Sequence, residues 1–337
     1  GIKMRKECIY RLGTWRTKYI STPEFYKKDN GKNVPLKDIN DCLQIGGKEF
    51  VMNLISEAKD VPVKSVVDYS EIEELDISQM DGVQTGIKPL DDELLKIFYG
   101  TLTVLSGRPG SGKTSIIDQT IARTIDGGNP VFLFSKEMPE RMSANWFNTI
   151  IAGRRNMVEK TSRDNRKYYI VPQVTQKKMQ AYDTKKLFIY RDDEPNDVES
   201  VLKSAEECVR KFGCKLIVLD NLMMIDLNCS ESDKNTAQTN LINALIKFAA
   251  KFNVAVVLIA HPRKTQDTNS DIEMYDISGT SNIINLAMRS IGLRRVSKKE
   301  KNDPKSKWHN YDVVLTVIKD RLLGKADFQM GLWYDLT

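Results

Sequence analysis

The sequence has few of the residues that hold metal ions or cross-links. It has five cysteines, an odd number with no pair in C-x-x-C spacing, and only two histidines. These counts exclude a disulfide framework and a zinc site built from cysteine and histidine. Free cysteines are also typical of proteins that work in a reducing compartment.

Long apolar runs and a strong charge of one sign are missing too. No stretch approaches the ~18 apolar residues that a membrane-spanning helix needs, and no signal-peptide pattern opens the chain. The 51 basic residues are nearly offset by 45 acidic ones, and a net charge of +6 permits a nucleic-acid partner without requiring one. Five lysines crowd residues 298–307, a pattern typical of a solvated loop.

From residue 83 onward, short apolar runs alternate with helical patterns at 114–125, 198–211 and 237–252. Buried strands joined by crossover helices predict an α/β fold with a mostly parallel central sheet, covered on both faces. The apolar runs are Thr101–Ser106, Val131–Phe134, Leu187–Tyr190, Leu216–Leu219 and Val254–Ile259. Three later runs predict an antiparallel C-terminal extension: Ile291–Val296, Val313–Lys319 and Gln329–Asp335.

Three zones follow from this pattern. Residues 1–62 form a small α/β unit, in which Asp38 and Asp41 have the character of turn and helix-cap residues. Residues 63–82 are acidic and sparsely apolar, which fits either a tether or a short helix that docks on a neighbouring subunit. Residues 83–337 form the large domain.

One segment carries a specific chemical signal. Residues 107–114 fit the pattern G-x-x-x-x-G-K-[ST], after an apolar strand and before a helix. Glycines let several backbone N–H groups converge on one phosphate, Lys113 reaches the terminal phosphates, and the Thr114 hydroxyl binds Mg²⁺. The expected nucleotide-binding residues are Gly107, Arg108, Pro109, Gly110, Ser111, Gly112, Lys113, Thr114 and Ser115.

Two carboxylates at strand ends complete a hydrolytic site. Asp220 closes the run Leu216–Leu219, where it would hold the Mg²⁺ shell together with Thr114. Glu137 follows a second strand, Val131–Phe134. Because the carboxyl ends of strands converge in open α/β sheets, Glu137 is the candidate base for the attacking water.

Several short motifs now point to one family. They are Thr85-Gly86-Ile87, Gly100-Thr101-Leu102-Thr103, Ser135-Lys136-Glu137-Met138, Asp220-Asn221-Leu222 and Ala260-His261-Pro262-Arg263-Lys264. Over about residues 83–337 the chain resembles the RecA-like ATPase domain of hexameric replicative helicases, in particular phage and Twinkle-like primase–helicases. The resemblance implies ATP or another NTP with Mg²⁺, a homo-oligomer of six subunits, and 5′→3′ movement on single-stranded DNA.

The resemblance also assigns residue roles. It makes Glu137 the catalytic base and His261 the sensor of the γ-phosphate, and it places Arg263 and Lys264 on the DNA backbone. Asp276–Ile283 is similar to the family's fourth motif, which follows a DNA-binding loop.

The late motif Val317–Gly324 resembles the segment that acts on the nucleotide of the adjacent subunit. Its arginine finger would be Arg321, with Lys319 as companion. Tyr334, or alternatively Trp333, would contact the base. In chemical terms, charge that builds on the γ-phosphate needs a cation beyond its own P-loop.

The first sixty residues resemble the closing part of a Toprim primase domain, on Arg11-Leu12-Gly13, Trp15-Arg16 and the stretch 37–43. The Toprim catalytic glutamate and Asp-x-Asp pair would lie upstream of Gly1. We therefore expect a C-terminal Toprim remnant without primase activity.

Two other functions stay open. A RecA- or KaiC-like DNA-dependent ATPase without unwinding activity would share the P-loop and Asp220, and a loader or scaffold would have a decayed site. We expect replication proteins such as a polymerase and a single-strand-binding protein as further partners, and no membrane. The expected location is the cytoplasm, that of a bacterial host if a phage encodes the chain, with the mitochondrial matrix as the alternative.

Overall fold

The structure is a computed structural model that describes residues 2–20, 26–29, 32–35, 38–63, 65–182, 185–261 and 282–334. The chain divides into two compact units, Gly1–Ile77 and Ser78–Thr337. Each unit is described by itself.

The smaller unit contains two helices and short strands. Asp38 caps helix α2 by accepting hydrogen bonds from the backbone N–H groups of Asn40 (2.9 Å) and Asp41 (3.0 Å), so its predicted capping role is confirmed. Gly47, at φ 69°, kinks the helix. The elements are α1 (Ile2–Leu12), β1 (Lys18–Tyr19), β2 (Tyr26–Asp29), β3 (Lys32–Pro35), α2 (Ile39–Ser56) and β4 (Lys59–Asp60).

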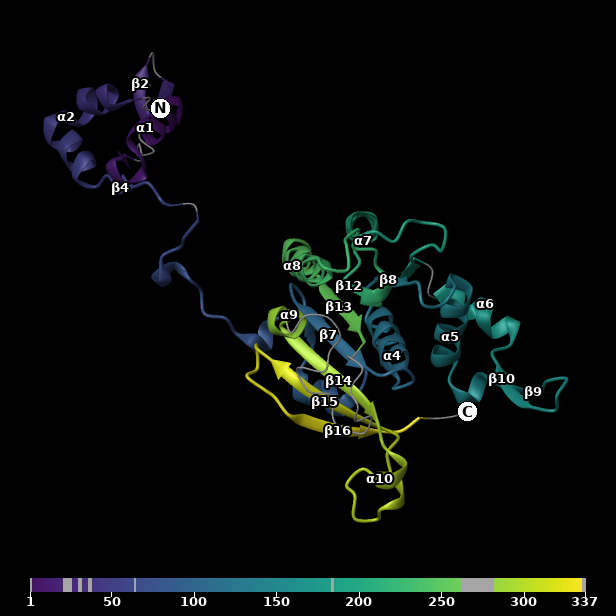
Figure 1. Ribbon diagram of the computed structural model, residues 1–337. Coiled ribbons are helices and arrows are strands. Elements are labelled where there is room, and N and C mark those ends of the chain that lie inside the picture. The colour runs from purple at the N-terminus through teal and green to yellow at the C-terminus, as the bar shows by residue number, and fades with distance from the viewer. Residues whose placement is uncertain are drawn as a thin grey trace. The chain divides into compact units, whose positions relative to one another are not determined.

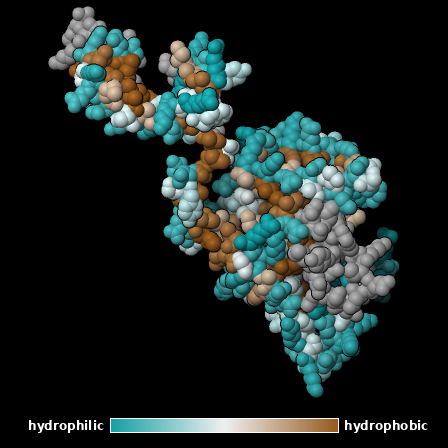
Figure 2. All heavy atoms as spheres, turned by 60° about the vertical axis from the view of Figure 1, so that its left-hand side comes forward, coloured by the Kyte–Doolittle hydropathy of each residue, from teal (hydrophilic) through white to brown (hydrophobic). Residues whose placement is uncertain are grey.

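The segment between the units contains two 3-10 turns, η2 (Tyr69–Glu71) and η3 (Ile77–Gln79), and no α-helix among its described residues. Apolar side chains along it are exposed and show as brown atoms in Figure 2. They are Val63, Val66, Val67, Ile72 and Leu75.

The larger unit is built on one eight-stranded sheet in the order β11-β8-β12-β13-β7-β14-β15-β16 (Figure 1). The first six strands are parallel, and the last two are antiparallel. Their bounds are β11 (Leu187–Ile189), β8 (Val131–Ser135), β12 (Leu216–Asp220), β13 (Ala255–Ala260), β7 (Leu102–Gly107), β14 (Arg289–Arg295), β15 (Val313–Asp320) and β16 (Phe328–Leu332).

Helices cover both faces of this sheet. Strands β7, β12 and β13 are buried at every position, which requires a layer on each side. One face packs against α7 (Val198–Phe212) and α8 (Lys234–Phe252), and the other against α3 (Lys88–Leu94), α4 (Lys113–Asp126) and α5 (Glu140–Ala152). The predicted RecA-like α/β fold is confirmed.

The C-terminal extension differs from the prediction in one strand. β14 pairs parallel with β7, and only β15 and β16 are antiparallel. The long connection from β13, which includes α9 (Asn282–Leu286), brings the chain back to the start of the sheet, so β14 runs in the parallel direction.

Two segments without a sequence motif have defined structure. Residues 158–182 form a hairpin of β9 (Val158–Thr161) and β10 (Lys167–Ile170), followed by α6 (Gln173–Tyr182). The remaining short elements are η1 (Thr14–Arg16), β5 (Gly82–Val83), β6 (Ile97–Phe98), η4 (Arg154–Asn156) and η5 (Leu222–Met224).

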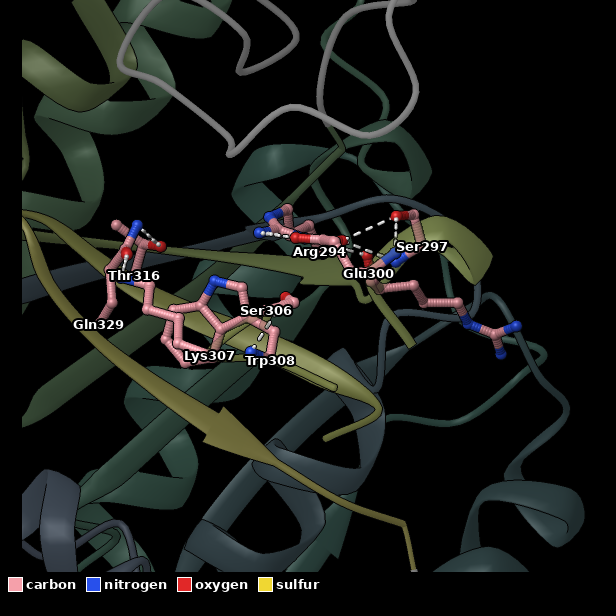
Figure 3. Close-up of polar contacts among 9 residues, drawn as sticks. Arg294, Ser297, Glu300, Ser306, Lys307, Trp308, Thr316 and Gln329 are labelled. Atoms are coloured by element: carbon pink, nitrogen blue, oxygen red, sulfur yellow. Dashed lines mark hydrogen bonds and ion pairs between the residues drawn. The ribbon is translucent and has the colours of Figure 1, made fainter. Parts of the chain in front are cut away.

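The lysine-rich stretch is more ordered than the predicted solvated loop. It begins with α10 (Lys298–Asn302), which Ser297 and Glu300 close with a capping box. In Figure 3, Glu300 lies between Ser297 and the buried Arg294 and accepts hydrogen bonds from both. Trp308 anchors the following turn by packing on Val296 and Val314. No helix among the described residues is long and apolar enough to cross a membrane.

Candidate active site

Four neighbouring strands deliver the candidate catalytic groups to one edge of the sheet. Asp220 is the last residue of β12 and is level with Ser135 at the end of β8, two residues before Glu137. Ala260 ends β13, level with Ser106 on β7, so His261 lies beside the start of the P-loop. The parallel register therefore brings together groups that are up to 154 residues apart, from Gly107 to His261.

The P-loop curls around the amino group of Lys113. Its Nζ atom donates to the carbonyl oxygens of Gly107 (2.8 Å) and Arg108 (3.2 Å). Gly112 precedes α4 in a left-handed conformation (φ 89°), which a residue with a side chain rarely adopts. A β-carbon there would lie 1.8 Å from the Tyr334 hydroxyl. The curl, the lysine and the helix start together suit a phosphate group.

The entry motif fixes the start of α4 from below. The Asp91 carboxylate accepts hydrogen bonds from the Thr85 N–H and hydroxyl (2.7 Å each) and from the Gly86 N–H (3.0 Å). The Gln119 side chain on α4 donates to the Gly86 carbonyl (2.9 Å). The motif thus braces the helix that carries Lys113.

Lys113, Glu137, Asp220 and His261 form one electrostatic cluster. Burial lowers the pKa of Lys113, against the attraction of Glu137 and Asp220. Burial, with a further contribution from Glu137, raises the pKa of Asp220 to about 6, against Lys113. Burial and then Lys113 lower the pKa of His261, which Glu137 opposes. Each group therefore responds to the charge of the others.

A small cavity beside Lys113 suits a magnesium ion. Oxygen-bearing side chains line it, from Thr114, Asp118, Ser135 and Asp220. Burial, followed by the charge of Asp220, raises the pKa of Asp118 to about 7. Two buried carboxylates this close together favour a cation, and Mg²⁺ prefers oxygen ligands. Thr114 and Asp220 would hold the ion, which would neutralise charge on the phosphate oxygens.

Three residues near the site were missed at the sequence level. Asp118 interrupts the apolar face of α4, which is a readable signal. Arg295 ends β14, and its Nε donates to the Gly110 carbonyl (2.6 Å). Two consecutive arginines after a predicted strand were the clue. Asn221 follows Asp220 and contacts both Glu137 and His261 at 3.0 Å.

Lys319 and Arg321 lie together, away from the P-loop of their own chain. β15 runs antiparallel to β14, so its end is level with Arg289 at the start of β14, at the opposite edge of the sheet. Lys319 Nζ donates to three carbonyl groups at the end of α9: Ile284, Asn285 and Ala287. Arg321 also donates to the carbonyl of Asn285. Burial, and then Arg321, lower the pKa of Lys319 to about 8.

The terminal aromatic residues separate clearly. Tyr334 lies against Gly112 of the P-loop, and the Asp312 carboxylate accepts a hydrogen bond from its backbone N–H (2.9 Å). Trp333 is 70% exposed and stacks on Tyr311 instead. The predicted DNA-contacting residues Arg263 and Lys264 lie outside the described residues.

Curated relatives match most of the chain at low identity. The "Twinkle homolog protein, chloroplastic/mitochondrial" of Arabidopsis thaliana is 24% identical over 314 residues, covering 88% of this chain and 42% of the relative. The "Probable plasmid replicative DNA helicase" of Chlamydia psittaci is 23% identical over 271 residues, covering 79% and 53%. The chain thus spans about half the length of these relatives.

Solved structures share the fold. One of them, an isolated ATPase domain, superposes with a TM-score of 0.59 at 17% identity, covering 76% of this chain and 89% of that one. A DnaB-like replicative helicase, solved to show its interactions with primase, gives the same TM-score at 18% identity, covering 88% and 71%. The family model "DnaB-like helicase C terminal domain" matches residues 82–322. The predicted resemblance is confirmed, and the chain belongs to the DnaB-like helicase C-terminal domain family.

Proposed function

We propose that the chain is the motor of a ring-forming replicative DNA helicase, which couples ATP hydrolysis to movement along single-stranded DNA. The observation that carries the proposal is the convergence of the P-loop, Glu137, Asp220 and His261 on one sheet edge. That arrangement provides phosphate binding, a magnesium ligand, a base and a group that feels the γ-phosphate.

In the proposed reaction, P-loop N–H groups and Lys113 bind the β- and γ-phosphates. Bound Mg²⁺ would supply charge neutralisation at the phosphate oxygens. Glu137 orients the attacking water and accepts its proton, and His261 responds to the presence of the γ-phosphate. Tyr334 and Arg295, both against the P-loop, bound the side on which the base would lie.

The finger assignment is supported by where the pair lies. Lys319 and Arg321 are at the far edge of the sheet from their own P-loop, so they act only if they reach the nucleotide of another copy. Exposed apolar residues of the 63–82 segment offer a surface that a neighbouring subunit would bury. Both features favour a closed ring, which we propose has six subunits.

DNA contact would come from Arg263 and Lys264 through backbone phosphates, with 5′→3′ polarity and little dependence on base sequence. A polymerase and a single-strand-binding protein are proposed partners. We further propose that residues 1–62 are the Toprim remnant and residues 63–82 the linker to the helicase domain.

The test is ATP hydrolysis with and without single-stranded DNA, together with unwinding of a forked duplex. We expect DNA to stimulate hydrolysis and a 5′ tail to support unwinding, and Lys113→Ala to lose both activities. DNA-stimulated hydrolysis without unwinding would favour the RecA- or KaiC-like alternative. No hydrolysis at any ATP and DNA concentration would overturn the proposal.

A further inference from the structure

The side chain of Asn221 is buried, with 2% exposed, and each of its polar atoms has a partner. Its Oδ1 accepts a hydrogen bond from the backbone N–H of Met223 (2.9 Å). Its Nδ2 lies 3.0 Å from Oε2 of Glu137 and 3.0 Å from Nε2 of His261. One amide group therefore connects the proposed base to the proposed sensor.

The orientation of this amide follows from its partners. The Met223 N–H can only donate, so the atom facing it must be the oxygen of Asn221, and the NH₂ group faces the other two residues. One hydrogen goes to the Glu137 carboxylate and the other to His261. The Nε2 atom of His261 must then accept, which places the proton of the neutral ring on Nδ1.

We propose that Asn221 is a positioning residue that couples the orientation of Glu137 to the state of His261; this rests on the proposed function of the site. Glu137 is exposed at the end of β8, where a carboxylate has several orientations available. The hydrogen bond from Asn221 selects one of them. If His261 turns or presents an N–H at Nε2, two donors meet, and the amide must shift its hold on Glu137.

The local structure gives this relay little slack. Asn221 caps the turn η5 and directly follows the buried Asp220. Asn196 supports the same turn from the other side, because its Nδ2 donates to the Met224 carbonyl (2.8 Å). Asn196 is not among the partners of Glu137 or His261, so it offers a control that perturbs the turn alone.

The first experiment separates the relay from the capping of η5. Asn221→Ser keeps an oxygen able to cap the turn but removes both N–H donors. We expect kcat for ATP to fall about 10- to 100-fold, with KM changed less than about 3-fold, and His261→Ala to behave similarly. The double variant should be no slower than the slower single one, since both break the same link. Asn196→Ala should stay within about 2-fold of the parent chain.

The second experiment reads the relay without catalysis. The chain has only two histidines, so nitrogen NMR of histidine-labelled protein can distinguish them, with His261→Gln used for assignment. We expect His261 to carry its proton on Nδ1, and Asn221→Ser to shift the proton toward Nε2. His309, whose contact is with the Ser306 carbonyl, should not change.

The outcomes are distinct. If Asn221→Ser keeps kcat within about 2-fold, if its effect multiplies with that of His261→Ala, or if His261 carries its proton on Nε2 in the parent chain, the relay is wrong. If instead Glu137→Gln hydrolyses ATP at the parent rate, the proposed function fails and takes the relay with it. A normal Asn221→Ser beside an inactive Glu137→Gln refutes the relay alone.

Discussion

At the scale of single residues, burial determines how the candidate groups behave. Asp220 is buried beside Lys113, while Glu137 stands exposed at the rim of the same site. This contrast fits their proposed roles: a metal ligand needs a fixed position, whereas a base must reach water.

The first prediction concerns the base. Glu137→Gln keeps the size of the side chain and can still meet Asn221, but it cannot accept a proton. We expect ATP turnover to fall about 10²- to 10⁴-fold, while a non-hydrolysable ATP analogue binds as before. Rapid-quench assays and equilibrium titration measure the two. Turnover at the parent rate would remove Glu137 from the proposed mechanism.

The second prediction concerns pH and Asp118. Its pKa in the folded chain is raised to about 7 from 3.8, so the ionised form is disfavoured and folding stability is lost as pH rises through this range. Asp118→Asn should therefore stabilise the chain, by up to about 4 kcal/mol at pH 8 and by less at pH 5. Urea unfolding at both values measures this. Exposed Asp164→Asn is the control, and an equal or negative effect at the two pH values would contradict the prediction.

At the scale of elements, the P-loop depends on a backbone conformation that only glycine adopts easily. Gly112→Ala adds strain at φ 89° and a collision with Tyr334, so we expect ATP affinity to fall at least about 10-fold. Gly128→Ala is a matched control, because Gly128 has φ 84° but no atom within 4 Å of the added carbon. It should cost about 1 kcal/mol of stability and leave ATP affinity unchanged. Equal affinities for both variants would contradict this account.

The finger segment is held by a buried ion pair. Arg289 bonds to Asp320 (2.8 Å) and to the carbonyl groups of Lys96 and Leu94, and Asp320 also accepts from the Leu322 N–H. Arg289→Ala should therefore cost about 3–5 kcal/mol of unfolding free energy. The exposed pair Lys88–Asp92 offers the control, since Lys88→Ala should cost less than about 1 kcal/mol. Denaturant unfolding compares the two, and similar losses would refute the structural role.

The elements could be predicted where burial is complete and not where pairing is long-range. The apolar runs 131–134 and 216–219 predict strands because both faces of those strands are covered. The direction of β14 depends on the connection from β13, which no local pattern encodes. In the site, strand ends predict Glu137 and Asp220. The role of Asn221 depends on two partners that are distant in sequence, at 137 and 261.

At the scale of the whole molecule, the proposed site is incomplete within one chain. The P-loop and the Lys319–Arg321 pair end at opposite edges of one sheet, and a rigid sheet cannot bring them together. A ring of identical subunits solves this geometrically, because each copy presents its far edge to the P-loop of the next. Hydrolysis would then depend on assembly.

Mixing two inactive variants tests this central claim most directly. Glu137→Gln retains the finger, and Arg321→Ala retains the base, so a mixed ring contains interfaces with both groups intact. In an equal mixture, about one quarter of the interfaces would be complete. The account predicts that each variant alone has almost no DNA-stimulated ATPase and that the mixture regains part of it. An active Arg321→Ala protein, or a mixture as inactive as its components although mixed rings have formed, would contradict the shared site.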